Sequence, residues 1–195
     1  PVPELIAVCR AHGAALMVDD AHGTGTLGAT GRGITEHFSL IDDHPDILVA
    51  TSSKALGVEG GAVAASAPVA KLLRQQARTF VYSTSSTPAT CAAVSAAIGV
   101  LEGEDSPVLA LHRNIRRLAS QLGMDAWASP IIPVPIGDET KAVDAAARLR
   151  EAGYFVPAIR WPTVPRGAAM LRVTVMSTHT YAQIDGLAQA LAQVR

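Results

Sequence analysis

Two short apolar runs, each followed directly by polar residues, most constrain what this chain can fold into. The first covers residues 14–18 and leads into Asp19, and the second covers residues 47–50 and leads into Thr51. Apolar runs of this length are typical of strands buried within a sheet. Ligands of open α/β sheets bind at the carboxyl ends of the strands. We therefore expect an α/β fold with a ligand site at two neighbouring strand ends.

An acid, a histidine and a lysine follow these two strands. Asp19 ends the first strand and His22 comes three positions later, whereas Lys54 follows the second strand after a short Ser/Thr turn. A carboxylate can keep a pyridine nitrogen protonated, as the electron sink of pyridoxal 5'-phosphate (PLP) requires. A lysine can form a Schiff base with the aldehyde of that cofactor and then transfer protons. With the hydroxyls of Thr51 and Ser53 available for a phosphate, this order of residues fits PLP.

Each of these residues also has an ordinary structural interpretation. Asp19 could cap a turn, with His22 as a simple loop histidine, and Lys54 could be a solvated surface lysine. Asp19, Asp20 and His22 could also be interpreted as metal ligands, with a strand-end pair at i and i+3. No third and fourth ligands are apparent to complete such a pair, so we expect no metal.

Residues 23–33 are too rich in glycine for a helix or a strand and are predicted to form a loop. Gly23, Gly25 and Gly28 formally match the dinucleotide-binding fingerprint Gly-x-Gly-x-x-Gly. In that motif the first glycine ends a strand and the last opens a helix. Here small and polar residues separate the strand from the first glycine, and more glycine follows the last one, so we do not expect NAD binding.

Composition narrows the class of protein. The net charge of −1 favours neither nucleic acid nor an anionic membrane surface. Cys9 and Cys91 show neither metal-ligand spacing nor a disulfide framework, which indicates a reducing, cytoplasmic setting. No apolar stretch approaches the ~20 residues of a membrane span. The 195 residues suffice for one large domain or two small ones.

Periodicity and turn residues predict the remaining elements. Leu5, Ile6, Val8 and Cys9 would form the apolar face of a first helix that ends at Gly13. The predicted strands are 14–19, 46–51, 63–66, 131–136, 154–160 and 170–176. The predicted helices are 68–78, 88–101, 107–122, 139–152 and one that opens with a capping box at Thr180. The alanine-rich helix 88–101 should pack tightly against another element. Residues 102–107 are the best domain boundary.

Three further segments carry polar groups that suit a site. Arg172, on an alternating strand, could clamp a substrate carboxylate or could simply be an exposed strand arginine. Thr163 lies in a proline-rich extended loop and could touch substrate. Residues 82–85 supply four hydroxyls that could hold phosphate, in their own chain's site or across a dimer interface, or form a solvated loop.

Four segments, in this order, resemble motifs of the α-oxoamine synthase family of fold-type-I PLP enzymes. They are residues 18–33, 51–57, 82–85 and 162–172, and the resemblance covers essentially the whole chain. It implies an α/β fold of the aspartate aminotransferase type. Residues 1–104 would be the C-terminal portion of the PLP-binding large domain, and residues 105–195 a small α+β C-terminal domain. The family's N-terminal half, with its ring-stacking group, is not in this sequence, so we expect a natural protein of about twice this length.

The resemblance also implies residue roles. The catalytic residues would be Asp19 at the pyridine nitrogen, His22 at the ring hydroxyl, and Lys54 as the covalent anchor. Ser83 or Thr84 would reach the cofactor phosphate of a partner subunit. Thr163 and Arg172 would hold substrate. The implied cofactor-binding set is Asp19, Asp20, Ala21, His22, Thr51, Ser52, Ser53, Lys54, Ser83 and Thr84.

The implied reaction is a decarboxylating condensation of an amino acid with an acyl thioester. Within the family, the Asp-Asp-Ala-His-Gly-x-Gly form at residues 19–25 most resembles the members that act in biotin biosynthesis. This resemblance implies L-alanine and a pimeloyl thioester, carried by coenzyme A or a carrier protein, as the substrates. We expect a homodimer with its active site at the interface. The alternatives are another member of the family (of the glycine C-acetyltransferase, 5-aminolevulinate synthase or serine palmitoyltransferase type) and a non-catalytic partner subunit, although the latter would be expected to lack Lys54.

Overall fold

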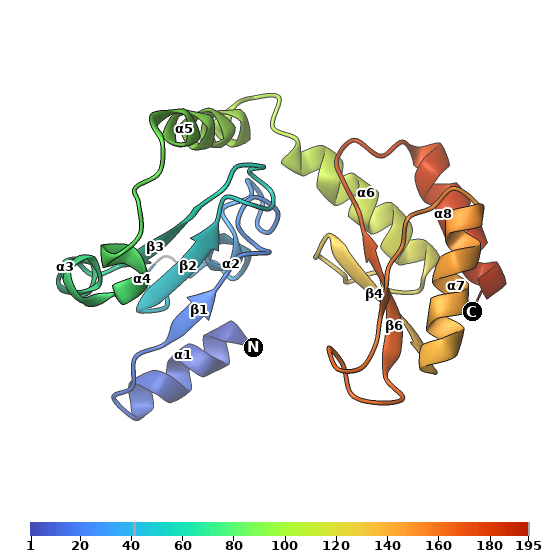
Figure 1. Cartoon of the computed structure of the whole chain (residues 1–195), viewed down its shortest axis with the longest axis horizontal. Helices are drawn as coiled ribbons and strands as arrows, with labels where there is room; N and C mark the ends of the chain where they lie inside the picture. Colours follow the sequence, from blue (N-terminus) through green and yellow to red (C-terminus); the bar gives the residue numbers. More distant parts are fainter. Residues whose placement is uncertain (41, 195) are drawn as a thin grey trace. The chain divides into compact units, whose positions relative to one another are not determined.

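The computed structural model describes residues 1–40 and 42–194, which form two compact units that meet in sequence at Val108 and Leu109 (Figure 1). The unit boundary falls next to the predicted linker at residues 102–107. The assignment of the units to a large and a small domain of a longer fold stays a prediction.

The first unit contains a three-stranded sheet in the order β1-β2-β3, made of β1 (Met17–Asp19), β2 (Ile47–Thr51) and β3 (Gly61–Ala65). β1 runs parallel to β2, whereas β3 runs antiparallel to it. The three predicted strands are confirmed, although the first is shorter than residues 14–19 and the third begins two residues early. Because β1 and β2 are parallel neighbours, their carboxyl ends share one edge of the sheet.

The helices of the first unit are α1 (Val2–Ala11), α2 (Ile34–His37), α3 (Ala67–Gln76), α4 (Arg78–Val81) and α5 (Pro88–Glu102). Gly13 ends α1 as predicted: at φ +60° it allows the Ala14 N–H to bond the Cys9 carbonyl at 2.9 Å, a Schellman motif. The single helix expected at 68–78 is wrong at its end. An extended Ala77 breaks it, and a separate short helix, α4, begins at Arg78.

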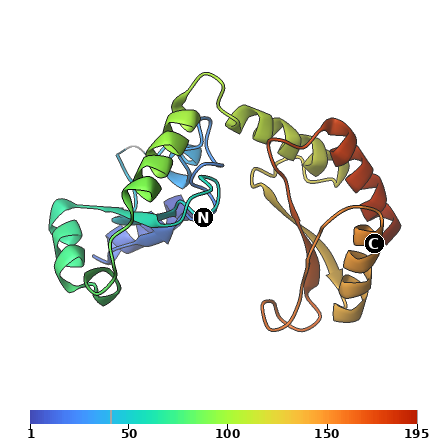
Figure 2. The ribbon, with the colours of Figure 1, turned by 45° about the horizontal axis from the view of Figure 1, so that its top comes forward.

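The second unit is a layer of helices on an antiparallel sheet. The sheet has the order β4-β6-β5, with β4 (Ile131–Gly137), β5 (Ala158–Ile159) and β6 (Ala169–Thr174). β4 lies at an edge of this sheet, the position that tolerates Pro133 and Pro135 because proline cannot donate to a strand on both sides. β5 has two residues instead of the seven expected. Helices α6 (Val108–Gln121), α7 (Glu139–Glu151) and α8 (Tyr181–Val194) pack on one face of this sheet (Figures 1 and 2).

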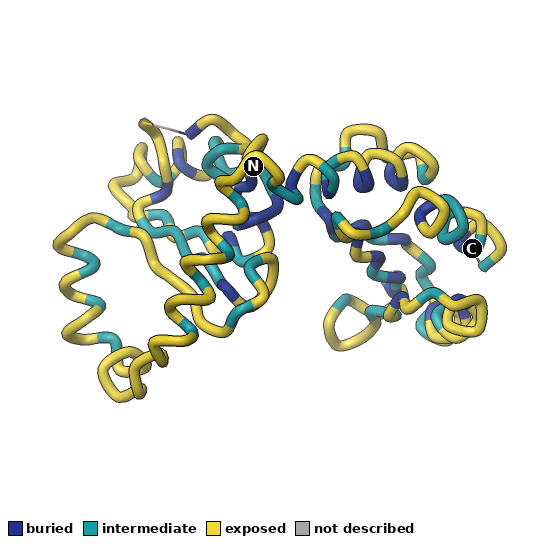
Figure 3. Tube along the Cα trace, turned by 90° about the horizontal axis from the view of Figure 1, so that it is seen from above, coloured by how far each residue is buried: buried dark blue, intermediate teal, exposed yellow. Residues whose placement is uncertain are grey.

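The two units differ in how completely they bury apolar side chains (Figure 3). The second unit encloses one core between its sheet and its helices. The core residues are Leu111, Ile115, Leu118, Ala119, Ile132, Val134, Ala145, Leu149, Val156, Leu171, Val173, Val175, Ile184 and Leu191. Among the described residues of the first unit, by contrast, the buried aliphatic side chains are Ile6, Leu40 and Val108.

Two packing expectations for the first unit are not met within this chain. Of the predicted apolar face of α1, only Ile6 is buried, whereas Leu5 and Val8 are 46% and 58% exposed. Helix α5, expected to pack tightly, has no buried residue. The alanine-rich pattern correctly predicted a helix with few polar side chains, but no described residues of this chain pack over it closely enough to bury any of its residues.

No helix within residues 1–40 and 42–194 combines the length and the apolar character needed to cross a bilayer.

Candidate functional site

The ends of β1 and β2 place Asp19 and Thr51 on the same face of the sheet. Asp19 lies opposite Val49 in the parallel register, and the Asp20 N–H continues the pairing with a 2.8 Å bond to the Val49 carbonyl. Val49 and Thr51 are two residues apart on β2, so their side chains point to one face, and Asp19 shares it. The expected convergence of the two strand ends is therefore present in the fold.

Asp19 has the turn-capping role that the sequence left open, and its role at the cofactor stays a prediction. Its Oδ1 accepts a 3.0 Å hydrogen bond from the Ala21 N–H, which closes a turn at the end of β1. The side chain nevertheless remains exposed, so its carboxylate is accessible to a ligand.

Asp20, also expected among the cofactor contacts, turns into the protein instead. It is 5% exposed and accepts hydrogen bonds from the Ile34 N–H (3.0 Å) and the Thr24 hydroxyl (3.3 Å). Burial raises the pKa of Asp20, while the bonds from Ile34 and Thr24 partly offset that rise. A Cβ atom on Gly23 or Gly33 would collide with its carboxylate oxygens, so both positions require glycine. In this structure the Asp20 side chain holds the glycine-rich loop.

A second carboxylate, which the sequence analysis missed, holds the other side of that loop. Glu36 on α2 accepts bonds from the Thr30 and Arg32 N–H groups (3.1 and 3.0 Å) and from the Thr30 hydroxyl (2.9 Å). Partial burial alone would raise the pKa of Glu36, but the bonds from Arg32 and Thr30 outweigh it and lower the pKa. The available signal was a glutamate three residues after Gly33, the N-cap of α2.

The loop at residues 23–33 is confirmed and is well organised. A bridge pairs Thr24 with Arg32, and the Gly25 N–H bonds the Gly31 carbonyl at 2.8 Å. The Thr26 hydroxyl donates to the His22 carbonyl at 2.6 Å, which ties the loop to the residue predicted to face the cofactor. The His22 residue itself is exposed, and Ala21 is half-buried.

Lys54 lies in the connection between β2 and β3, residues 52–60, where the Gly57 N–H bonds the Lys54 carbonyl at 3.1 Å and closes a turn. Ser52, 5% exposed, holds this connection because its hydroxyl donates to the Glu59 carbonyl at 3.0 Å. Thr51 and Ser53 form a hydroxyl pair 2.7 Å apart at the end of β2. Lys54 and Ser53 are exposed, so an amine and two hydroxyls are available at this strand end.

Ser83 and Thr84 lie apart from the strand ends in sequence and in secondary structure. Both follow α4 on an exposed segment, and the Ser83 hydroxyl donates to the Thr79 carbonyl. Their predicted contact is with a partner subunit, and it stays a prediction.

The two predicted substrate contacts belong to the second unit. Arg172 on β6 is half-buried between Leu171 and Val173, which face the helices, so its own side chain lies on the opposite face of the sheet. Its N–H bonds the Pro157 carbonyl at 2.9 Å. Thr163 is exposed in the loop before β6, and its N–H bonds the Arg160 carbonyl at 2.9 Å.

The donor set at the strand ends suits PLP. An exposed carboxylate, an imidazole, a primary amine and paired hydroxyls complement a protonated pyridine nitrogen, a ring hydroxyl, an aldehyde and a phosphate, respectively. Within the described residues, no cluster of three His, Cys, Asp or Glu side chains is placed to hold a metal ion.

Comparisons with known proteins agree with a PLP-binding fold. The model of the family described as aminotransferase class I and II matches residues 2–191. The biotin biosynthesis bifunctional protein BioWF of Corynebacterium kroppenstedtii is 45% identical over 98% of this chain and 30% of its own length. A putative 8-amino-7-oxononanoate synthase of Desulfovibrio desulfuricans is 45% identical over 97% of this chain and 50% of its own length.

A solved structure, of SPT with a PLP internal aldimine, superposes with a TM-score of 0.89 at 29% identity, over 100% of this chain and 50% of its own. The chain thus spans about half the length, or less, of these relatives. The expected fold, the C-terminal part of a PLP-dependent transferase of the aminotransferase type, is confirmed by these matches. The chain belongs to the aminotransferase class I and II family, and its predicted kinship with the α-oxoamine synthases is confirmed.

Proposed function

We propose that this chain supplies one part of the active site of a PLP-dependent acyltransferase of biotin biosynthesis. L-Alanine and a pimeloyl thioester would condense to 8-amino-7-oxononanoate, with release of CO2 and the free thiol. The observation that carries the proposal is the parallel pairing of β1 and β2, which brings Asp19 and the segment from Thr51 to Lys54 to one sheet edge. The 45% identity to a putative 8-amino-7-oxononanoate synthase supports the choice of substrates.

Each exposed group at the strand ends has one task in this proposal. Asp19 keeps a proton on the pyridine nitrogen by charge and hydrogen bonding, and His22 donates to or accepts from the ring hydroxyl. The hydroxyls of Thr51 and Ser53 bind the phosphate. Bound PLP supplies the electron sink for negative charge at the substrate Cα.

Lys54 anchors the cofactor and then acts as the base. Its primary amine, once free, would remove the proton from Cα of the alanine substrate. An exposed lysine in the connection between β2 and β3, with small residues around it, has the freedom of movement that these two roles require. Arg172 would bind the substrate carboxylate as a two-point clamp, and Thr163 would contact the same substrate.

The active enzyme would be a homodimer. Ser83 or Thr84, on their exposed segment, would donate to the cofactor phosphate bound in the partner subunit. Ala21 and Ser52 complete the two strand-end segments, with Ser52 acting through the connection that it holds.

The absorbance of bound PLP tests the proposal. The full-length protein should purify with, or take up, PLP and show the absorbance band of a lysine-linked cofactor. Lys54→Ala should abolish that band, whereas Lys71→Ala, which removes an exposed lysine on α3, should leave it unchanged. Wild-type protein that shows no band after incubation with PLP would rule the proposal out.

A second candidate is a serine palmitoyltransferase-type activity, because an SPT structure superposes on the whole chain. Product analysis with alanine, glycine and serine, each offered with pimeloyl-CoA and palmitoyl-CoA, separates the two candidates. Faster turnover of glycine or serine than of alanine would replace the proposed substrate.

A further inference from the structure

The glycine-rich loop between β1 and α2 contains two carboxylates that the proposed chemistry does not use. Asp20 is buried at the start of the loop, and Glu36 lies on α2 at its end. A buried carboxylate is costly unless its oxygens are hydrogen-bonded, so its presence calls for an explanation.

Both carboxylates accept hydrogen bonds from across the loop. Asp20 reaches Ile34, fourteen residues further along the chain, with a 3.0 Å bond from its N–H. Glu36 accepts bonds from three donors, the N–H groups of Thr30 and Arg32 and the Thr30 hydroxyl. Hydrogen bonds to charged acceptors are the stronger kind in proteins. The loop is therefore held from its two ends.

Close packing leaves the loop little room to move. A Cβ atom on Gly33 would strike the Asp20 carboxylate, and a Cβ atom on Gly28 would strike the Glu36 carboxylate. Both glycines also have φ values near +83°, in the left-handed region that favours glycine. Their role is to let two carboxylates enter a folded loop.

This folded loop connects directly to the groups that would face the cofactor. Asp20 is the neighbour of Asp19 in sequence, and its own carbonyl accepts bonds from the Gly23 and Thr24 N–H groups (3.0 and 2.9 Å). The Thr26 hydroxyl then holds the His22 carbonyl. Fixing residues 23–33 thus fixes the backbone on both sides of His22.

We propose that Asp20 and Glu36 are positioning residues that clamp the loop at residues 23–33 and thereby hold Asp19 and His22 at the orientation the cofactor ring requires. The cofactor part of this inference rests on the proposed function. The clamp itself does not, because it follows from hydrogen bonds within the chain.

The first arm of the test measures the clamp without cofactor. Amide hydrogen exchange is followed for residues 22–33 in wild type, Glu36→Gln and Glu36→Ala. Exchange should accelerate in both variants, and more in the alanine variant because glutamine keeps one acceptor oxygen. The control is Asp46→Ala, because Asp46 also accepts a backbone N–H, from Leu16 at 2.8 Å, but at the opposite end of the same strands. Unchanged exchange of residues 22–33 in Glu36→Ala overturns the inference.

The second arm measures positioning in the full-length protein with PLP. Glu36→Ala should weaken PLP binding by about tenfold and shift the pH profile of the bound-cofactor absorbance, with Asp46→Ala close to wild type. Asp20→Asn provides a second variant that preserves side-chain shape and should retain binding better than Asp20→Ala. Equal weakening by Glu36→Ala and Asp46→Ala would indicate general destabilisation and overturn the positioning role. Wild-type protein that fails to bind PLP defeats the proposed function, and the exchange arm still decides the clamp.

Discussion

The two units of this chain are stabilised in different ways. The second unit surrounds a closed apolar core with three helices and a sheet, and most of its large aliphatic side chains are buried. The first unit leaves Met17, Leu72 and Phe80 59–64% exposed and relies on sheet pairing and a hydrogen-bonded loop. The predicted cofactor-binding groups all lie in the first unit. The part of the chain predicted to bind the cofactor is thus the part with the least apolar burial, and we expect it to open at lower free energy than the second unit.

The sharpest test of this difference is the same truncation in each unit. Leu118→Ala, at a fully buried position of α6, should lower the free energy of unfolding by about 2–5 kcal/mol. Leu72→Ala, at a position of α3 that is 59% exposed, should change it by less than about 0.5 kcal/mol. Urea titrations of both variants provide the measurement. If Leu72→Ala lowered the free energy of unfolding as much as Leu118→Ala does, the proposed difference between the two units would be wrong.

A buried amide extends the comparison to polar contacts. Asn114 on α6 is 3% exposed and donates to the carbonyls of Met176, Ser177 and His179 (2.9, 3.3 and 2.9 Å). Asn114→Ala should cost about 1–3 kcal/mol because it leaves buried carbonyls unsatisfied. Thermal and urea unfolding, with the exposed Ser120→Ala on the same helix as control, would check this. A loss of stability no larger than that of Ser120→Ala would contradict a stabilising role for the hydrogen bonds between Asn114 and residues 176–179.

In the first unit, the pH dependence of stability should reveal Glu36. Its pKa is lowered in the folded state, so it stabilises the fold above its ordinary pKa of about 4.5 and loses this effect as the pH falls through the lowered value. Glu36→Gln should therefore cost about 1 kcal/mol at pH 7 and progressively less below pH 4.5. The pH dependence of stability due to Asp20 has the opposite sign. Its pKa is raised in the folded state, so protonation as the pH falls through that value removes the cost of burying its charge and stabilises the fold. Urea unfolding across pH 3–7 measures both, and a deficit of Glu36→Gln that grows toward low pH would refute the assignment.

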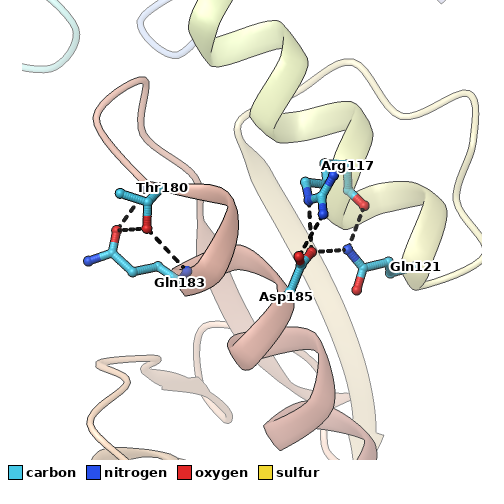
Figure 4. A network of polar contacts seen from close by, with 5 residues as sticks. All are labelled: Arg117, Gln121, Thr180, Gln183 and Asp185. Carbon is cyan, nitrogen blue, oxygen red and sulfur yellow. Dashed lines mark hydrogen bonds and ion pairs between the residues drawn. The ribbon is translucent and has the colours of Figure 1, made fainter.

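The smallest effect is expected on the surface of the second unit. Arg117 forms a two-point ion pair with Asp185 (2.8 and 2.6 Å), and Gln121 donates to the same carboxylate (Figure 4). The Arg117 guanidinium also lies 4.4 Å from the centre of the Tyr181 ring. The hydrogen bonds from Arg117 lower the pKa of Asp185. Because the pair is exposed, Arg117→Met should shift the thermal midpoint by no more than about 2 °C, and less still in 1 M salt. A larger shift of the thermal midpoint that does not depend on salt would show that this exposed ion pair contributes substantially to the stability of the second unit.

The sequence was most informative where the physical signal is local. The polar residues after two apolar runs marked the strand ends correctly. The expectation that these strands are buried is not met within this chain, because every described residue of β1 and β2 is half-buried or exposed. The capping box that opens α8 is also confirmed, with the Thr180 N–H bonded to Gln183 at 2.9 Å and the Gln183 N–H bonded back to the Thr180 hydroxyl at 3.3 Å (Figure 4).

The features that could not be predicted from the sequence depend mostly on contacts between residues far apart in the chain. Asp19 and Asp20 are chemically equal neighbours, and only the fold shows that one stays exposed while the other reaches Ile34. Glu36 was missed for the same reason, since its partners lie in a loop without periodicity. The break at Ala77 that separates α3 from α4 follows from a local backbone conformation that no residue pattern announces.

The strand order of the first sheet has a practical consequence. Among the described strands, β1 and β3 each pair on one side alone, with β2, so both outer margins present backbone N–H and C=O groups to whatever lies beside them. Such margins are templates for strand addition. Purified samples of the isolated chain should therefore aggregate as the protein concentration is raised, at temperatures below the unfolding transition. A short peptide that pairs as a strand with either margin should reduce this aggregation.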